Sequence, residues 1–345
     1  MKMNLKHLRT ALLTAFMAVL AVACKKDDDD GNRESMSGSV NFDFPTYAVA
    51  GQKVESYVSG VMTPPDPEYM WVSHDMDISE TDTVYGQSIS FYLPEEPGEY
   101  TISVFAMHPE YYSLNKEATV TVISADLEDV GGVEPGDDEF VDPRDGEVYY
   151  TVRYGNLEWF TQNLRYAGTA DAPLGCAYEN SDGIDMVFGR LYSWNDATGG
   201  VSGSGLGNGP QGACPDGWSV PTREDWEDLA RSVGGKEYDF YDTWKGLGDI
   251  MTASITMSGV EMWPYSPDND HSNTSRWNGF PSGNSRDGYG DFENISVYGM
   301  WWSSMELEDG TVPYRFVYYD ADTFDVYYTD KDTYGVSVRC VRLVE

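Results

Sequence analysis

Basic residues are scarce in this sequence. It has 22 Lys and Arg against 58 Asp and Glu, which gives a formal net charge of -36. A chain this acidic repels the phosphates of nucleic acid and the anionic headgroups of a bilayer surface. Nucleic acid is therefore excluded as a partner.

Histidine and cysteine are equally scarce, with four of each. The histidines are His7, His74, His108 and His271, and the cysteines are Cys24, Cys176, Cys214 and Cys340. A zinc site needs several such side chains on one face, and the spacing of the histidines brings no two of them together. The sequence therefore argues against a zinc site.

The apolar run at the N-terminus, Ala11 to Ala23, is too short to span a bilayer, which takes about 20 residues. Basic residues precede this run, and small residues end it. That order is typical of a signal sequence that is removed on export. We therefore expect residues 1–23 to be absent from the mature protein.

Cys24 directly follows this run, and the residues before it are Leu20, Ala21, Val22 and Ala23. The segment resembles the lipobox of bacterial lipoproteins, in which the new N-terminal cysteine is acylated, although Leu20 lies one place earlier than usual. Cleavage by ordinary signal peptidase is the alternative. The resemblance implies a lipid on Cys24 that anchors the protein in the outer membrane.

Residues 24–36 form an acidic tether that begins with Lys25, Lys26 and the run Asp27 to Asp30. It resembles the export signal of surface lipoproteins of the Bacteroidetes type, which implies that the protein faces the cell exterior. The alternative is a solvated spacer, because adjacent carboxylates repel one another and cannot pack.

Residues 37–124 predict a small antiparallel sandwich. Polar and apolar residues alternate with period two, and Gly and Pro turns separate the runs. The segment 97–104 resembles a strand of immunoglobulin-like and PKD-like modules, with Tyr100 as the corner tyrosine and Trp71 as the core tryptophan. Such all-β modules commonly serve as stalks.

Residues 125–141 are rich in Asp, Glu and Gly, which predicts an acidic linker. A calcium site is the alternative, since clustered carboxylates suit a hard cation. The spacing of an EF-hand loop is missing, however, so the linker is favoured.

The rest of the chain, residues 142–345, predicts strands and one capped helix. A hairpin is expected around Gly155 and Asn156, which tolerate the backbone angles of a tight turn. Thr222 and Asp225 are placed to cap a helix that ends before Gly234. A further helical turn is expected near 191–197, and strands joined by long polar loops from Ser254 onward.

Ordered motifs along 142–345 resemble the Fibrobacter succinogenes major paralogous domain. They are Asp142-Pro143-Arg144-Asp145-Gly146, Gly189-Arg190-Leu191-Tyr192-Ser193-Trp194, Cys214-Pro215-Asp216-Gly217-Trp218, Trp302-Ser303-Ser304 and Gly335-Val336-Ser337-Val338-Arg339-Cys340. The resemblance implies a C-type-lectin-like α+β fold, similar in plan to formylglycine-generating enzymes. It implies no enzymatic activity. The whole protein is then multidomain, an all-β sandwich followed by an α+β domain.

The same resemblance implies a disulfide between Cys214 and Cys340. Members of the family commonly have a second cysteine soon after the position of Cys176, and this chain has none there. Cys176 is therefore expected to be unpaired. The alternative for Cys214 and Cys340 is a pair of buried thiols.

No arrangement of residues indicates catalysis, because Cys176 has no histidine near it in sequence and any acidic pair could arise by chance. A binding surface is the better interpretation, since planar rings and short polar side chains are typical of recognition surfaces. The loop Trp263 to Asp291 is too polar to be wholly buried, whereas Trp218, Trp301 and Trp302 are expected in the core. The candidate ligand-binding residues are Trp263, Tyr265, Trp277, Asn278, Tyr289, Tyr318 and Tyr319.

Calcium is a further possibility in this domain, since many lectins of similar fold hold a sugar through the ion. The carboxylates available are Asp268, Asp270 and Asp291, but the sequence triplets of those lectins are missing. The sequence thus predicts a non-catalytic surface lipoprotein that binds a glycan or a protein ligand and needs no cofactor. A structural or pilus-like assembly component is the first alternative, and a hydrolase is the second.

Overall fold

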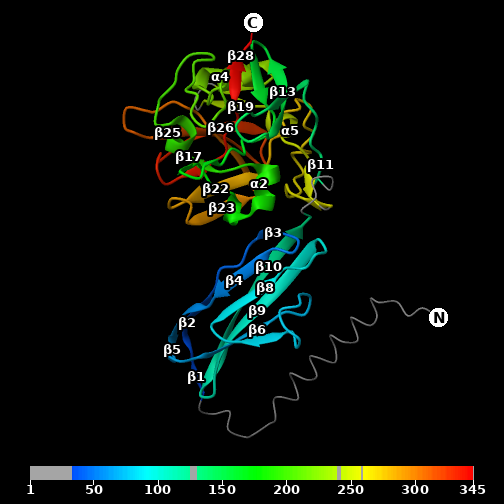
Figure 1. The fold of residues 1–345 in the computed structure, drawn as a ribbon, viewed down its shortest axis with the longest axis vertical. Helices are drawn as coiled ribbons and strands as arrows, with labels where there is room; N and C mark the ends of the chain where they lie inside the picture. The colour runs from blue at the N-terminus through cyan, green and yellow to red at the C-terminus, as the bar shows by residue number, and fades with distance from the viewer. Residues whose placement is uncertain (1–32, 125–129, 239–241, 258, 345) are drawn as a thin grey trace, which may run out of the picture.

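The computed structural model describes residues 33–124, 130–238, 242–257 and 259–344. This part of the chain consists mostly of β-strands with a few short helices (Figure 1). Among the described residues, no helix is both long and apolar enough to cross a membrane. The predicted signal sequence, Cys24 and most of the tether lie outside the described residues.

Residues 34–123 form an elongated, sandwich-like unit, which we call the N-terminal unit (Figure 1). Its larger sheet has the strand order β1-β10-β9-β6-β7, and β3 pairs with β10. Two smaller ladders join β2 to β5 and β4 to β8. The strands are β1 (Glu34–Ser35), β2 (Ser37–Asn41), β3 (Tyr47–Val49), β4 (Lys53–Tyr57), β5 (Ser59–Thr63), β6 (Glu68–Val72), β7 (Thr83–Tyr85), β8 (Ser88–Tyr92), β9 (Gly98–His108) and β10 (Tyr111–Ile123).

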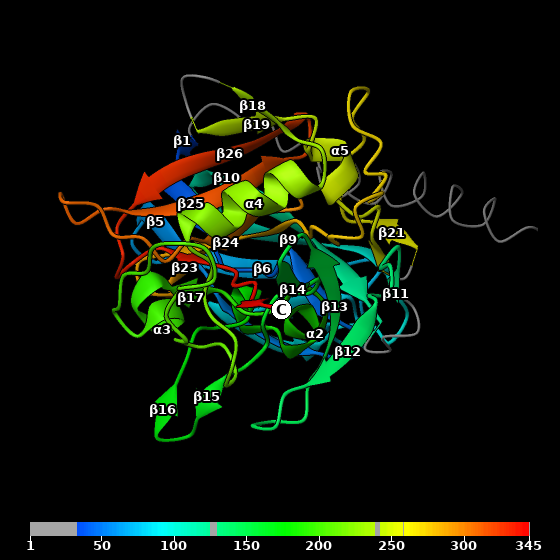
Figure 2. The same ribbon diagram turned by 90° about the horizontal axis from the view of Figure 1, so that it is seen from above.

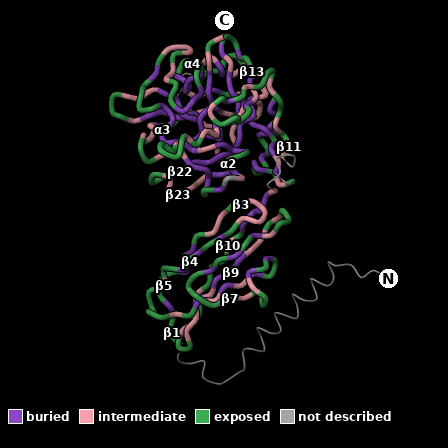
Figure 3. The backbone as a smooth tube through the Cα atoms, viewed as in Figure 1, coloured by how far each residue is buried: buried purple, intermediate pink, exposed green. Residues whose placement is uncertain are grey.

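Along the strands of both layers, every second side chain points inward, and these side chains form a single core. Trp71 lies at its centre, fully buried, and its indole N–H donates to the carbonyl oxygen of Gly86 at 2.9 Å. Tyr100 lies at the edge, where its hydroxyl donates to the carbonyl oxygen of Glu96 at 2.7 Å. Figure 3 shows buried stretches interspersed with exposed ones along these strands.

Residues 130–344 form a second, larger unit, which we call the C-terminal unit. Its sheets have the orders β12-β13-β14-β28, β17-β27-β22-β23, β18-β19-β26-β25-β24 and β11-β20-β21, with the ladder β15-β16 beside them. The strands are β11 (Val130–Gly131), β12 (Asp138–Val141), β13 (Val148–Tyr154), β14 (Leu157–Phe160), β15 (Gly168–Thr169), β16 (Ala172–Pro173), β17 (Tyr192–Ser193), β18 (Lys236–Tyr238), β19 (Thr243–Lys245), β20 (Thr256–Met257), β21 (Val260–Glu261), β22 (Ser282–Arg286), β23 (Asp291–Ile295), β24 (Tyr298–Trp302), β25 (Val312–Tyr318), β26 (Thr323–Thr329), β27 (Gly335–Val336) and β28 (Val341–Leu343).

Few helices accompany these sheets. The capped helix is present as α4, where the Thr222 hydroxyl accepts from the Asp225 amide at 3.2 Å and the Asp225 carboxylate accepts from the Thr222 amide at 2.9 Å. The expected turn near 191–197 is also present as α3, whereas α2 was not expected. The helices are η2 (Tyr178–Asn180), α2 (Asp182–Phe188), α3 (Trp194–Thr198), α4 (Arg223–Ser232) and α5 (Gly248–Met251).

The linker predicted at 125–141 is wrong in its second half. Residues 125–129 lie outside the described part, but β11 pairs with β20, and β12 pairs with β13 along its whole length. The Asp138 and Glu139 side chains are exposed, so the backbone joins a sheet while the charges stay in water. An acidic composition therefore did not prevent strand formation at the edge of a sheet.

The predicted hairpin is confirmed. Strands β13 and β14 pair in register from Thr151 opposite Phe160 to Tyr154 opposite Leu157, with Gly155 at a positive φ of 62° in the turn. The disulfide between Cys214 and Cys340 is present, with the Cα atoms 5.8 Å apart. Cys176 is free and buried.

The two units pack directly against each other at the end of β3 (Figure 1). The Glu179 carboxylate accepts from the Thr46 amide at 2.9 Å and from the Thr46 hydroxyl at 3.3 Å. The hydroxyls of Tyr47 and Ser296 lie 2.7 Å apart, and Ile123 of β10 is buried in the core of the C-terminal unit. Polar and apolar contacts together therefore join the stalk-like unit to its neighbour.

This contact predicts a pH dependence. Burial raises the pKa of Glu179 above its usual value, and the hydrogen bonds from Thr46 only partly oppose this. The folded state then holds the proton more tightly than the unfolded state, so the free energy of unfolding falls as the pH rises from the usual glutamate pKa through the raised one. Urea unfolding between about pH 4 and pH 7 should show a shallower fall for Glu179→Gln. Equal slopes for the two proteins would contradict this assignment.

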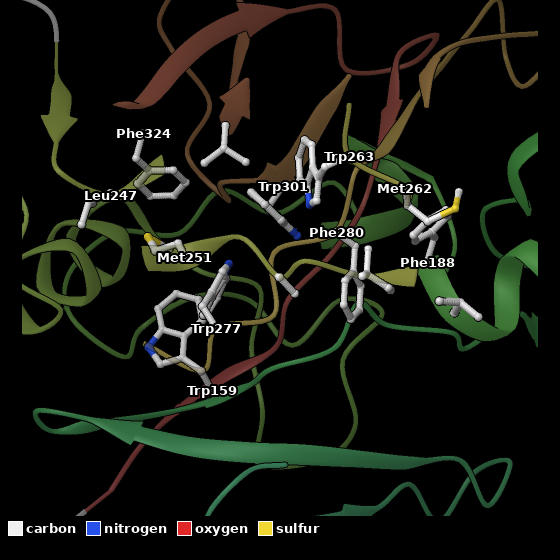
Figure 4. Packing of buried hydrophobic residues seen from close by; sticks show 14 of the residues in the cluster. Trp159, Phe188, Leu247, Met251, Met262, Trp263, Trp277, Phe280, Trp301 and Phe324 are labelled. Carbon is white, nitrogen blue, oxygen red and sulfur yellow. The ribbon is translucent and has the colours of Figure 1, made fainter. Parts of the chain in front are cut away.

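The core of the C-terminal unit is built from tryptophan. The Trp277 ring centroid lies 5.3 Å from that of Trp159 and 6.1 Å from that of Trp301 (Figure 4). It also lies 5.8 Å from that of Trp226. Such edge-to-face pairs add about 0.5–1.5 kcal/mol each beyond the burial of their area. Trp218, Trp301 and Trp302 are buried as predicted.

Candidate functional site

Three of the predicted ligand-binding residues cannot reach a ligand in this structure. Trp263, Trp277 and Asn278 are only 3, 0 and 0 % exposed. The expectation that the loop 263–291 displays these side chains is therefore wrong for them.

The physical reason lies in the polar side chains of the loop. The Asn278 side chain accepts from the Glu134 amide at 2.9 Å and donates to the Glu134 carbonyl oxygen at 2.8 Å. Its backbone amide donates to the Asn273 side chain at 2.9 Å. Short polar side chains supply hydrogen-bond partners for the backbone N–H and C=O groups of the loop. A polar loop can therefore be buried without leaving these backbone groups unpaired.

Two further candidates lie apart from each other. Tyr265 is 85 % exposed, in an irregular segment. Tyr289 is half-buried, and its hydroxyl donates to the Asp196 carboxylate and accepts from the Ser193 amide at 2.6 Å. Tyr289 thus holds β17 and α3 in place, and its hydroxyl already has partners.

Tyr318 and Tyr319 belong to a row of rings that we call the aromatic face. It consists of Tyr298, Tyr314, Phe316, Tyr318, Tyr319, Tyr327 and Tyr334. Ring centroids along the row are 4.6 Å apart from Tyr319 to Tyr318, 4.9 Å from Tyr318 to Tyr298 and 5.8 Å from Tyr298 to Phe316. From Phe316 the row continues to Tyr314 at 6.1 Å, and from Tyr314 to Tyr327 at 6.0 Å.

Strand register explains why the rings of Tyr298, Tyr314, Phe316, Tyr318 and Tyr327 share one side of the sheet. Tyr298 pairs with Tyr318, and Tyr314 pairs with Tyr327, so their side chains project together from β24, β25 and β26. The alternate residues Trp301 and Phe324 point the other way, into the core beneath α4. Figure 2 shows α4 lying across this sheet. The aromatic face lies on the side opposite α4, where Trp302 and Tyr314 are buried and Tyr318 is partly exposed.

The aromatic face is open to solvent along much of its length. Tyr327 is 61 % exposed, and Tyr298, Phe316 and Tyr318 are partly exposed. Tyr314 is buried behind them, with its ring centroid 5.4 Å from that of Tyr334 in a stacked arrangement. The packed rings hold the exposed ones at low entropic cost.

Polar groups border the aromatic face. The Thr323 hydroxyl donates to the Asp325 carboxylate at 2.6 Å, and the Ser266 hydroxyl donates to the Asp320 carboxylate at 2.6 Å. The hydrogen bond with Tyr319 raises the pKa of Tyr318 to about 12, further from neutral pH than the ordinary tyrosine value. The site therefore combines neutral planar rings with fixed carboxylates.

Comparison with known proteins identifies the C-terminal unit. The Fibrobacter succinogenes major domain matches residues 152–342. The chain belongs to this family. The match covers more than half of the chain and includes the aromatic face.

Other comparisons add little. A search of curated proteins gives no match. One solved structure, from work on the structural basis for the promiscuous specificity of carbohydrate-binding modules of the β-sandwich superfamily, aligns over 91 % of this chain and 94 % of its own. Its sequence identity is 9 % and its TM-score 0.23, which is too low to support a shared fold.

The described residues of the Fibrobacter succinogenes major domain gather no cluster of metal ligands. Within the described ranges, no three His, Cys, Asp or Glu side chains come together in a way that could hold an ion. Asp268, Asp270 and Asp291, the predicted calcium candidates, are each exposed and do not form such a group.

The free thiol of this family domain, that of Cys176, is buried and unreactive. Burial raises the pKa of the Cys176 thiol to about 12. Since the thiolate is the reactive form, the thiol of Cys176 is not activated at neutral pH.

Sequence analysis missed most of the aromatic face. Tyr298, Tyr314, Phe316 and Tyr334 were not among the predicted residues. The signal was present as period-two spacing, since Tyr314, Phe316 and Tyr318 alternate along one strand. That pattern does not show which side of the strand is covered.

Proposed function

We propose that this protein is a non-catalytic, lipid-anchored surface protein whose family domain binds a glycan or a protein through the aromatic face. The observation that carries the proposal is the row of rings in edge-to-face and tilted contact, left partly open on β24, β25 and β26. A neutral glycan fits best, because the apolar C–H face of a sugar ring packs on an aromatic ring while its hydroxyls reach carboxylates such as Asp325.

The negative charge of the protein further restricts the class of ligand. Asp320 and Asp325 border the rings, and the chain as a whole carries a net charge of -36. A polyanionic glycan or an acidic protein would be repelled at long range. No cofactor is needed for stacking, so we expect binding to be the same with and without calcium.

The remaining parts of the proposal rest on the sequence motifs. The lipobox-like segment before Cys24 and the acidic tether support an outer-membrane lipoprotein that faces the exterior. The buried Trp71 and the hydrogen bond from Tyr100 to Glu96 support an immunoglobulin-like or PKD-like stalk. The motifs of the family domain support a C-type-lectin-like α+β fold.

A double variant tests the aromatic face. Tyr318→Ala with Tyr327→Ala removes two accessible rings, and binding should weaken by roughly 30-fold or more, since hot-spot tyrosines contribute about 2 kcal/mol or more. The measurement is a glycan-array and host-protein screen of the full chain with Cys24→Ser, with and without calcium, followed by affinity measurements on each hit.

Tyr265→Ala is the matched control, because Tyr265 is 85 % exposed and lies outside the aromatic face. Binding that survives the double variant but is lost in the control would refute the site. No binding by the folded protein in any arm would favour a structural role in a surface assembly.

A further inference from the structure

A separate slot opens between the outer strands β12 and β13 and the helix α2. Its volume is about 580 Å³, within the range of small-molecule pockets. In Figures 1 and 2, β13 and α2 lie away from β25 of the aromatic face. An inference about the slot is therefore independent of the function proposed for the aromatic face.

The two walls of the slot differ in chemistry. One wall is apolar and consists of Val130, Val133, Met186, Val187 and Phe280. The other is polar and includes Glu139, Glu147, Tyr150, Gln162 and Arg165. At the mouth, the apolar side chains of Met186 and Val148 are 42 and 41 % exposed. A ligand with an apolar body and one polar end fits such a slot.

The ion pairs among the residues of the slot determine which charge the polar end of the ligand should carry. The Arg165 guanidinium contacts the Glu147 carboxylate at 2.7 Å and donates to the Val148 carbonyl oxygen at 2.8 Å, so its charge is compensated. Within the described part of the chain, the Glu139 carboxylate takes part in no ion pair or side-chain hydrogen bond. The slot thus contains the carboxylates of Glu139 and Glu147 and the guanidinium of Arg165, which together carry a net charge of -1.

Strand register places an aromatic ring beside this carboxylate. Glu139 of β12 pairs directly with Tyr150 of β13, so their side chains project from the same side of the sheet. The Gln162 side-chain oxygen accepts from the Tyr150 amide at 2.8 Å, which fixes this part of the wall. An ammonium group between a carboxylate and a ring face gains from both charge and cation–π attraction.

We propose that the slot binds an organic amine, with its ammonium group at Glu139 and Tyr150 and its apolar stem against the exposed side chains of Met186 and Val148. The stem replaces water on the apolar wall, and the ammonium neutralises the unpaired carboxylate. The same chemistry is offered by a free alkylamine and by a lysine side chain of a partner protein.

The test is an NMR titration of the full chain with Cys24→Ser, using hexylamine, hexanol, hexanoate and N-acetyl-lysine methylamide. Hexylamine should bind roughly tenfold or more tightly than hexanol, and hexanoate should bind least. Added salt should narrow the gap, because the charged end is near the surface. The lysine derivative separates the two sources, since affinity equal to that of hexylamine indicates a protein lysine and weaker affinity a free amine.

Glu139→Gln should remove the preference for hexylamine over hexanol while leaving hexanol binding unchanged. Met186→Gln should weaken both ligands, because it places a polar group on the apolar wall. Glu308→Gln, an exposed carboxylate outside the slot, should change neither. Equal affinities for hexylamine and hexanol, or binding of neither, would overturn the proposal.

Discussion

Arg339→Met is expected to lower the free energy of unfolding of the C-terminal unit by about 4 kcal/mol or more. Arg339 is fully buried. Its guanidinium donates to the Asn163 side chain at 2.6 Å and to the carbonyl oxygens of Trp277 at 2.7 Å and Asn278 at 2.5 Å. Methionine fills much of the space but leaves these acceptors without a donor. Each unsatisfied buried acceptor costs about 1–3 kcal/mol.

The rings around Arg339 add to this effect. Its guanidinium lies 4.6 Å from the Trp277 ring centroid and 5.7 Å from that of Trp301, within cation–π range. The arginine thus connects β14, the loop 263–291 and the last strands at one point. Lysine keeps the positive charge, but its single ammonium group cannot reproduce the planar fork of donors of the guanidinium. Arg339→Lys should therefore also lower the free energy of unfolding strongly.

Urea unfolding followed by tryptophan fluorescence measures the change. Arg153→Met is the matched control, because Arg153 is exposed on β13 and, among the described residues, its side chain bonds only to the Gly155 carbonyl oxygen. It should shift the free energy of unfolding by less than about 0.5 kcal/mol. A value for Arg339→Met within about 1 kcal/mol of the unchanged protein would refute the role given to this residue.

Loss of the Cys214–Cys340 disulfide is expected to cost about 4 kcal/mol, through the entropy of the unfolded chain. The two cysteines are 126 residues apart in sequence, so the bond closes most of the C-terminal unit into one loop. It ties the segment before α4 to the segment before β28, and both sulfur atoms are buried. The double variant Cys214→Ala, Cys340→Ala removes the bond without adding a free thiol to that of Cys176.

Cys176→Ala is the control for that variant, since it removes a buried thiol that closes no loop. It should cost about 1 kcal/mol, as a small cavity does. Thiol counting on the denatured chain with Cys24→Ser should find one free thiol before reduction and three after it. Three thiols before reduction would show that the disulfide does not form.

Local patterns predicted the regular elements well. The Gly155-Asn156 turn and the Thr222 cap depend on backbone groups within a few residues, so they could be found from the sequence. The disulfide came from the family motifs rather than from spacing. Strand β12 was missed because acidic composition suggested a linker, whereas edge strands tolerate exposed charge.

By itself, the sequence determined the acidic charge, the β-rich composition and the family of the C-terminal domain. It also placed Trp218, Trp301 and Trp302 in the core. Only the tertiary structure decided which rings of the binding candidates face solvent. Trp277 is covered by other tryptophans and its loop satisfies its own backbone, whereas Tyr318 projects from the side of the sheet opposite α4 and stays partly exposed. Exposure depends on what packs against each side of a strand, and that is set by segments distant in sequence.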